Sequence, residues 1–566
     1  MAEQVAEKQV VEKHLWTWRA FIAGFILAII MCAINSYLVL RFGIMEEGPM
    51  IAALIFFAVF LKAKNKITIA EMVIVATMGS AGGSLGFISN FYAAQVMVGN
   101  PYTILEMFVF SVVTCIIGLL SVIVMRQILV IQDAKLPEGQ RLPWVGAKVV
   151  KGMIDTLVDK GDFMQARYLI FFSIAFVMYV LFNNDGGVGW FPAYCDITLL
   201  GLSAFGAAIA FSPFLWGTSY MMGFRTCVAF GVGGIIMMLI APYTPVPVAP
   251  HKFVWPGIMF LVFSGITGLT IHWRVMKDAL VSLFKIESGK DEDPIMSPRA
   301  TLIMTVVGIT LTIVCLMTMF KLTLLVIVAM IAIGGIVLNV IATRAAAQTY
   351  FNPARVMGIL LQGVAAMLGG SSVQANLTGA GFVAGSGAQG GNLTNDMAYG
   401  LWYRVKSSWQ FWSQASTILV CSLVAALTFY MINSNVEISL DGKELAAPIA
   451  KIWATIGLLF DPQAKMELPK YAIESMWIGG IAGVVYTLLE RKWRKYLPCS
   501  IGLGLAMVLP VGYGFGFFFG GVLMWYVLGR YLKISKITLN TIAVASIVGE
   551  GIGGIFTGIL KTIGIL

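Results

Sequence analysis

Two Gly-rich polar stretches lie within long apolar runs, and their residue types suit the binding of a small polar solute. The first covers residues 71–84 and the second covers residues 369–400. Irregular backbone at membrane depth is tolerated where it lines a water-filled cavity, and broken helices at corresponding places in two halves are typical of transporter binding sites. We therefore expect helices to break at both stretches. The predicted substrate-binding residues are Ser80, Gly82, Gly83, Ser84, Gln348, Asn352, Gln374, Asn376, Asn392, Asn395 and Asp396.

The glycines in these stretches have a second interpretation. Small residues also let membrane helices approach one another closely, and this alternative stays open. The concentration of glycine together with Asn, Gln and Asp favours binding, because these side chains add hydrogen-bonding groups to freed backbone.

Three carboxyl groups in apolar sequence are candidates for proton coupling: Glu71, Asp396 and Glu550. Ionisable groups at membrane depth are costly, so each is a functional hypothesis. A carboxyl group removed from water holds its proton more readily, and it could therefore load and release a proton near neutral pH. Arg225 lies in equally apolar sequence and is predicted to be a structural or gating charge. Buried pairing is the alternative for Arg225, Asp396 and Glu550.

The composition places these residues in a membrane protein. Hydrophobic residues make up 59% of the chain and charged residues only 12%, against about 25% in soluble domains. Apolar runs of about 20 residues recur, each long enough to cross a bilayer, and they do not alternate as barrel strands do. We predict an all-α polytopic membrane protein of about 16 transmembrane helices.

The chain divides near its middle at a charged segment. Because the two Gly-rich stretches lie at similar depths in the two halves, we expect two structural repeats with the broken helices at the centre. The predicted parts are a cytoplasmic tail at 1–15, a transmembrane half at 16–284, a charged cytoplasmic linker at 285–299, and a second half at 300–566 with an external loop at 434–469. The predicted helices include 68–95, 197–212, 215–241, 354–370, 374–396 and 538–566, the last broken at 549–554.

The basic residues fit a membrane orientation better than a nucleic-acid partner. The formal net charge is +10, and the basic residues cluster in loops that would be cytoplasmic under the positive-inside rule. Segments 96–103 and 183–194 carry no Lys or Arg and are expected outside. We predict a multi-pass protein of the plasma membrane with a cytoplasmic N-terminus and no signal peptide. Lipid, protons and a small-molecule substrate are its expected partners, and a homo-oligomer is left open.

Other chemistries find little support in the sequence. The seven cysteines form no C-x-x-C pair, and the three histidines are not spaced as metal ligands, so we expect no metal site and no cofactor. The chain also lacks a phosphate-binding loop and an H-E-x-x-H motif, which disfavours an ATP-driven pump and a zinc protease. We predict that the protein is not an enzyme.

Six short blocks resemble, in order, those of the oligopeptide transporter (OPT) family, in its yellow-stripe-like or prokaryotic branch. The blocks are NSYLVLRFG at 35–43, EMVIVATMGSAGGS at 71–84, KLPEG at 135–139, QTYFNP at 348–353, GNLTNDMAYG at 391–400 and VGEG at 548–551. The resemblance implies about 16 helices and secondary active uptake of small peptides, or of metal chelates of amino-acid-derived ligands, driven by a proton gradient. The chain departs from the family pattern at Met72, Val73, Ala76, Asn392 and Ala398, which makes the first region less polar.

The leading prediction is a proton-coupled symporter for small oligopeptides or amino-acid-derived metal chelates. The alternative is a passive channel for a small polar solute, which would equilibrate its solute without accumulating it. A membrane-embedded enzyme would need a convergent catalytic constellation, and a non-transporting scaffold would leave the buried carboxyl groups unexplained.

Overall fold

A computed structural model describes most of the chain as helix. It describes residues 17–42, 48–60, 66–136, 141–159, 163–183, 187–196, 208–240, 255–271, 293–350, 352–368, 372–439, 447–459, 471–509 and 511–562. The predicted tail at 1–15 and the first part of the predicted linker, 285–292, lie outside the described residues.

The first half of the chain contributes helices and one small sheet. They are α2 (Trp18–Phe42), α3 (Gly48–Phe60), α4 (Ile69–Gly86), α5 (Ser89–Met97), α6 (Ile104–Met125), η1 (Arg126–Ile131), α7 (Gln132–Ala134), α8 (Val145–Ile154), η3 (Asp155–Asp159), α9 (Phe163–Phe182), β1 (Tyr194–Asp196), β2 (Ala208–Ala210), α10 (Pro213–Met222), α11 (Phe224–Ile240) and α12 (Trp255–Ile271), where η marks a π-helix.

The second half contributes helices alone among the described residues. They are α14 (Pro298–Thr318), α15 (Leu324–Ala329), η6 (Met330–Leu338), α16 (Asn339–Thr349), α17 (Ala354–Met367), α18 (Val373–Trp402), α19 (Ser407–Asn435), α20 (Pro448–Leu459), α21 (Ala472–Lys492), α22 (Ser500–Ala506), α23 (Val511–Gly521), η7 (Val522–Tyr531) and α24 (Lys536–Thr562).

These elements form a helical bundle of the kind that crosses membranes. Eight of the described helices are long and apolar enough to span a bilayer, and six shorter apolar helices accompany them. Exposed leucine, isoleucine and valine side chains cover the outer faces of helices such as α14 and α19, as a lipid-facing surface requires. The predicted all-α polytopic architecture is confirmed, whereas the predicted pair of repeats stays a prediction.

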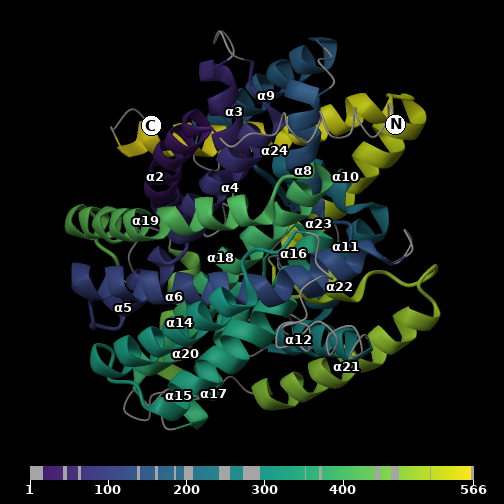
Figure 1. The fold of residues 1–566 in the computed structure, drawn as a ribbon. Helices are drawn as coiled ribbons and strands as arrows, with labels where there is room; N and C mark the ends of the chain where they lie inside the picture. Colours follow the sequence, from purple (N-terminus) through teal and green to yellow (C-terminus); the bar gives the residue numbers. More distant parts are fainter. Residues whose placement is uncertain are drawn as a thin grey trace.

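Helix α18 occupies the centre of the bundle, with α4, α6, α16, α17 and α19 packed around it (Figure 1). Nearly all of its thirty residues are buried. Since α4 and α6 come from the first half of the chain and α18 from the second, the two halves interleave at the core.

The described residues of the first Gly-rich stretch and residues 373–400 of the second are helical, so the prediction that helices break there is wrong, while residues 369–371 lie outside the described residues. Residues 79–86 lie within α4, residues 374–396 lie within α18, and the predicted break at 549–554 lies within the continuous helix α24. The only interruption within 69–97 is a two-residue turn between α4 and α5.

Close helix packing explains the glycines. A Cβ atom on Gly82 would collide with the backbone of Ala28 in α2, and one on Gly381 would lie 2.5 Å from the ring of Phe91 in α5. Small residues in membrane helices permit this kind of approach, and the helical backbone then satisfies its own hydrogen bonds. The packing interpretation therefore accounts for these positions without unwound backbone.

The region before α10 differs from the prediction of a helix over 197–212. Residues 208–210 form strand β2, which pairs antiparallel with β1, while 197–207 lie outside the described residues. Ser212 caps α10 through the amide of Leu215, and Pro213 occupies its first turn. A cap of this type needs extended backbone, which ends any preceding helix. The predicted helix 215–241 is likewise divided, at Gly223, whose φ is +85°.

Helix α20 lies within the predicted external loop 434–469. It packs against α5, α17, α18 and α2, and the external position of the loop stays a prediction. Its Trp453 is fully buried and donates a hydrogen bond of 3.1 Å to the carbonyl oxygen of Arg355. Residues 440–446 and 460–469 of the loop lie outside the described residues.

Candidate functional site

Asp396 lies at the centre of the protein, on the face of α18 that contacts α4. Its side chain has no exposed surface, and neither carboxylate oxygen forms a hydrogen bond to the described residues. The hydroxyl groups of Ser80 and Tyr399 are its polar neighbours. An isolated carboxylate is very costly to bury, so this environment makes the charge of Asp396 depend on access to water.

Polar side chains of α4 and α18 face one another in antiparallel order. Thr77 Oγ1 lies 3.5 Å from the hydroxyl oxygen of Tyr399, and Ser84 Oγ accepts a hydrogen bond of 2.8 Å from Asn392 Nδ2. Ser80 and Asp396 lie between these two pairs. Positions 77, 80 and 84 share one face of α4 because a helix repeats every 3.6 residues. The predicted residues Ser80, Ser84, Asn392 and Asp396 are thus brought together.

Helix α19 adds two amide side chains to this interface, and the sequence analysis missed both. Gln410 Nε2 donates to the carbonyl oxygen of Asp396 at 2.8 Å and to Thr77 Oγ1 at 3.2 Å. Gln414 Nε2 donates to the carbonyl oxygen of Gln389 at 3.4 Å. Glutamines spaced four residues apart in an apolar run share a helix face, and this pattern is the signal that could have identified them.

Several buried polar atoms around α18 have no hydrogen-bond partner among the described residues. Both side-chain atoms of Gln389 and of Asn376 lack one, as do Oε1 of Gln410 and Oε1 of Gln414. Native proteins leave few such atoms, and each one requires an explanation such as bound water or ligand. We therefore regard the interface of α4, α18 and α19 around Asp396 as the candidate functional site.

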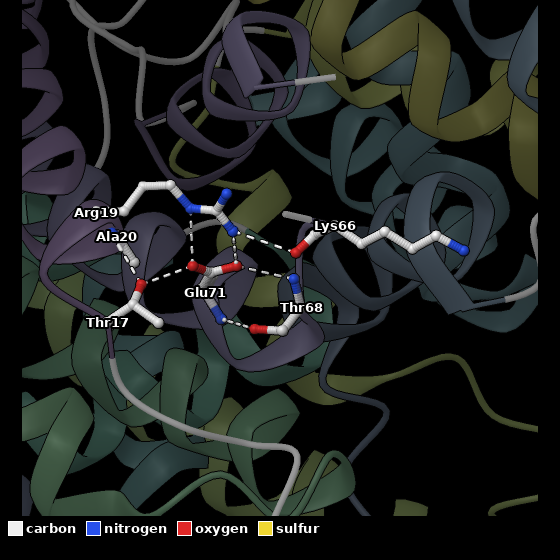
Figure 2. Close-up of polar contacts among 6 residues, drawn as sticks. All are labelled: Thr17, Arg19, Ala20, Lys66, Thr68 and Glu71. Carbon is white, nitrogen blue, oxygen red and sulfur yellow. Dashed lines mark hydrogen bonds and ion pairs between the residues drawn. The ribbon is translucent and has the colours of Figure 1, made fainter. Parts of the chain in front are cut away.

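Glu71 is held in a different way from Asp396 (Figure 2). Its carboxylate accepts hydrogen bonds from Thr17 Oγ1 at 2.6 Å, from Arg19 Nε at 3.0 Å, from Arg19 Nη2 at 2.6 Å and from the amide of Thr68 at 2.9 Å. The Glu71 amide in turn donates to Thr68 Oγ1 at 3.2 Å, which completes a capping box at the start of α4. The same cluster ties α2 to α4.

Glu550 is also engaged, at the N-terminus of α10. Its carboxylate accepts hydrogen bonds from Ser212 Oγ, at 2.8 and 2.7 Å, and from the amide of Phe214 at 2.8 Å. A carboxylate at this position satisfies free amides and interacts favourably with the helix dipole. Glu550 therefore belongs to the contact between α24 and α10, and the structure does not bring it to Asp396.

Two predicted residues, Arg225 and Gln348, line a separate cavity of about 850 Å³. Arg225 Nη2 forms an ion pair of 2.5 Å with Glu490, and its Nε donates to the carbonyl oxygen of Leu497 at 2.8 Å. Gln348 Oε1 lies 3.6 Å from the thiol of Cys499. Arg225 is thus a paired charge, as the structural alternative expected.

The remaining predicted residues are distributed over the bundle. Asn352 donates to the carbonyl oxygen of Gly387 at 2.9 Å and accepts from the amide of Ala354 at 3.0 Å, so it joins the start of α17 to α18. Asn395 faces Gly146 of α8. Gln374 donates to the hydroxyl group of Tyr102 at 3.3 Å, near the other end of α18.

Gly82 and Gly83 face α2 and α3, away from the candidate site. A Cβ atom on Gly83 would lie 3.5 Å from the Cα atom of Gly48 in α3. These two glycines serve helix packing in this arrangement, and their role in substrate binding stays a prediction.

The architecture and the buried polar interface define the class of the protein: a polytopic helical membrane protein with a polar, protein-enclosed centre, as transporters have. A model of the OPT oligopeptide transporter protein family matches residues 15–247 and 253–561. The chain therefore belongs to the OPT oligopeptide transporter family, as the sequence blocks indicated. A comparison with curated proteins returned no match.

Proposed function

We propose that the protein is a proton-coupled symporter that imports small oligopeptides or amino-acid-derived metal chelates, with Asp396 as the group that carries the proton. Membership of the OPT family implies oligopeptide transport across a membrane. The observation that supports the finer proposal is the burial of Asp396 without a hydrogen-bond partner among the described residues.

Proton coupling would follow because the charge of the Asp396 side chain depends on its access to water. A conformational change that opens the interface of α4 and α18 to water would change the protonation of Asp396, because water would stabilise its charged form beyond what the neighbouring hydroxyl groups of Ser80 and Tyr399 offer. Protonation would in turn favour the closed arrangement. If Asp396 is open first to one side of the membrane and then to the other, one proton crosses the membrane in each transport cycle.

Glu71 and Glu550 remain candidates for proton coupling, under a stricter condition. Each would have to release several hydrogen bonds on protonation, including those from Arg19 to Glu71 and from Ser212 to Glu550. We place the protein in the plasma membrane with its N-terminus in the cytoplasm, as the distribution of basic residues indicates.

The test is uptake into proteoliposomes under an imposed proton gradient. Labelled di- to pentapeptides are compared with ferric and nickel chelates of amino-acid-derived ligands, with and without a protonophore. We expect accumulation above equilibrium of one class, and collapse of that accumulation by the protonophore. Equilibration without accumulation would support a passive channel in place of the symporter.

A further inference from the structure

The cavity that contains Arg225 and Gln348 is strongly basic and lies apart from Asp396. None of its lining residues comes from α4 or α18. The lining comes from η1, from α7 and the segment after it, from α10, α11, α12 and α16, and from α21, α22 and the segment between these two. Its charged residues are Arg141, Arg225, Arg344, Arg491, Arg494, Asp133 and Glu490. A volume of about 850 Å³ is within the range of small-molecule sites.

The two acidic residues of the cavity are already engaged. The amide of Leu142 donates to both carboxylate oxygens of Asp133, at 3.0 and 3.1 Å. Glu490 uses one oxygen for Arg225 and accepts with the other from the amide of Ser500 at 2.9 Å. Asp133 also attracts the guanidinium groups of Arg344 and Arg141 electrostatically.

Three of the five arginines have no hydrogen-bonded partner among the described residues. Arg225 is held by Glu490, and Arg141 donates to the carbonyl oxygen of Leu136 at 2.6 Å. Arg344, Arg491 and Arg494, by contrast, form no hydrogen bond or ion pair with the described residues. Asp133 attracts Arg344 electrostatically, but five arginines against two carboxylates leave the lining with an excess of positive charge.

Arg344 is the deepest of these three. It lies in α16, within a segment apolar enough to span the membrane, whereas Arg491 and Arg494 are exposed at the end of α21. A charged side chain at such a position is costly unless it meets a partner, and a guanidinium group matches the geometry of an oxyanion with two parallel hydrogen bonds.

Gln348 lies one turn after Arg344 on the same helix, so both side chains can reach one ligand. The Gln348 side-chain oxygen faces the Cys499 thiol, which leaves its amide nitrogen to donate. A guanidinium and an amide donor side by side suit a carboxylate or phosphate oxygen.

We propose that this cavity binds the terminal carboxylate of a peptide or amino-acid-derived substrate, with Arg344 as its main partner and Gln348 as a second donor. The inference rests on the proposed function, because it takes the transported solute as the ligand. Inorganic phosphate shares the oxyanion chemistry and is the competing source.

The test is equilibrium binding to the full chain in lipid nanodiscs, without a proton gradient. Isothermal titration compares trialanine with its C-terminal amide and with inorganic phosphate. We expect the free acid to bind between about 10-fold and 100-fold more tightly than the amide, which corresponds to hydrogen bonds with a charged group. Arg344→Gln should lose that difference, and Arg344→Lys should retain part of it.

Arg530→Gln is the matched control, because Arg530 is exposed on η7 and does not line the cavity. Equal binding of acid and amide by the wild type, or unchanged binding by a folded Arg344→Gln variant, would overturn the proposal. Binding of phosphate without binding of trialanine would also overturn it. Loss of proton-driven uptake with the binding pattern intact would refute the symport mechanism and leave the carboxylate site standing.

Discussion

Asn392 of α18 donates a hydrogen bond of 2.8 Å to Ser84 of α4, and the two residues are 308 positions apart in the chain. This contact joins the two Gly-rich stretches directly. The stretches therefore form one interface between antiparallel helices, and the candidate site is built where they meet.

The energetic value of this contact can be measured with a double-mutant cycle of Ser84→Ala and Asn392→Ala. We expect a coupling free energy of about 0.6 kcal/mol, because interhelical hydrogen bonds in membranes contribute modestly. Thermal unfolding in detergent supplies the measurement. A pair with no hydrogen bond between them, Ser84 and Asn395, serves as the control cycle and should show additive effects.

Asp396→Asn should abolish proton-driven accumulation while the protein stays folded. The amide has nearly the same shape but cannot exchange a proton, so we expect substrate counterflow without a gradient to persist. Uptake into proteoliposomes measures both activities. Asp196→Asn, an exposed carboxylate on β1, is the control and should accumulate substrate normally. Full proton-driven accumulation by Asp396→Asn would remove Asp396 from the mechanism.

Gly82→Ala should destabilise the protein, by about 1–3 kcal/mol, because the added methyl group would meet the backbone of Ala28 and force α2 from α4. The shift in unfolding temperature checks this. Gly234→Ala in α11 is the control, since its nearest neighbour would lie at an ordinary 3.7 Å. Equal stability of the two variants would show that α2 and α4 are less tightly packed than described.

Glu71→Ala should cost more stability than Glu106→Ala, although both residues complete a capping box with a threonine three positions before. The Glu106 box lacks an arginine, so we expect a loss of about 1 kcal/mol there. The loss at Glu71 should be about 2 kcal/mol larger, because Arg19 would be left without its carboxylate partner. Similar losses at the two sites would mean that the ion pair contributes little.

The sequence predicts the architecture and part of the site. The features that could not be predicted have physical explanations. Hydropathy reports burial in lipid or protein, so the membrane helices and the position of Asp396 in an apolar context could be predicted. The continuity of the helices could not be predicted, because glycine is compatible both with unwound backbone and with close helix packing. Only the neighbouring backbone, such as that of Ala28 beside Gly82, distinguishes the two.

The partners of the carboxyl groups were the other unpredictable part. The capping motif around Thr68 and Glu71 can be recognised from its spacing, but Arg19 lies 52 positions away. Glu550 and Ser212 are 338 positions apart. Contacts over such distances depend on which helices pack together, and a single sequence does not contain that information.

The position of α18 determines which residue types the helix can contain. This helix is enclosed by other helices and is not among the eight spans that length and hydropathy identify. The residues around α18 are protein side chains and not lipid acyl chains, so α18 does not need the hydrophobic surface that a lipid-facing helix needs. Two properties are therefore under constraint along α18: the size of each residue, and the presence of a hydrogen-bond partner, water or ligand for each polar one.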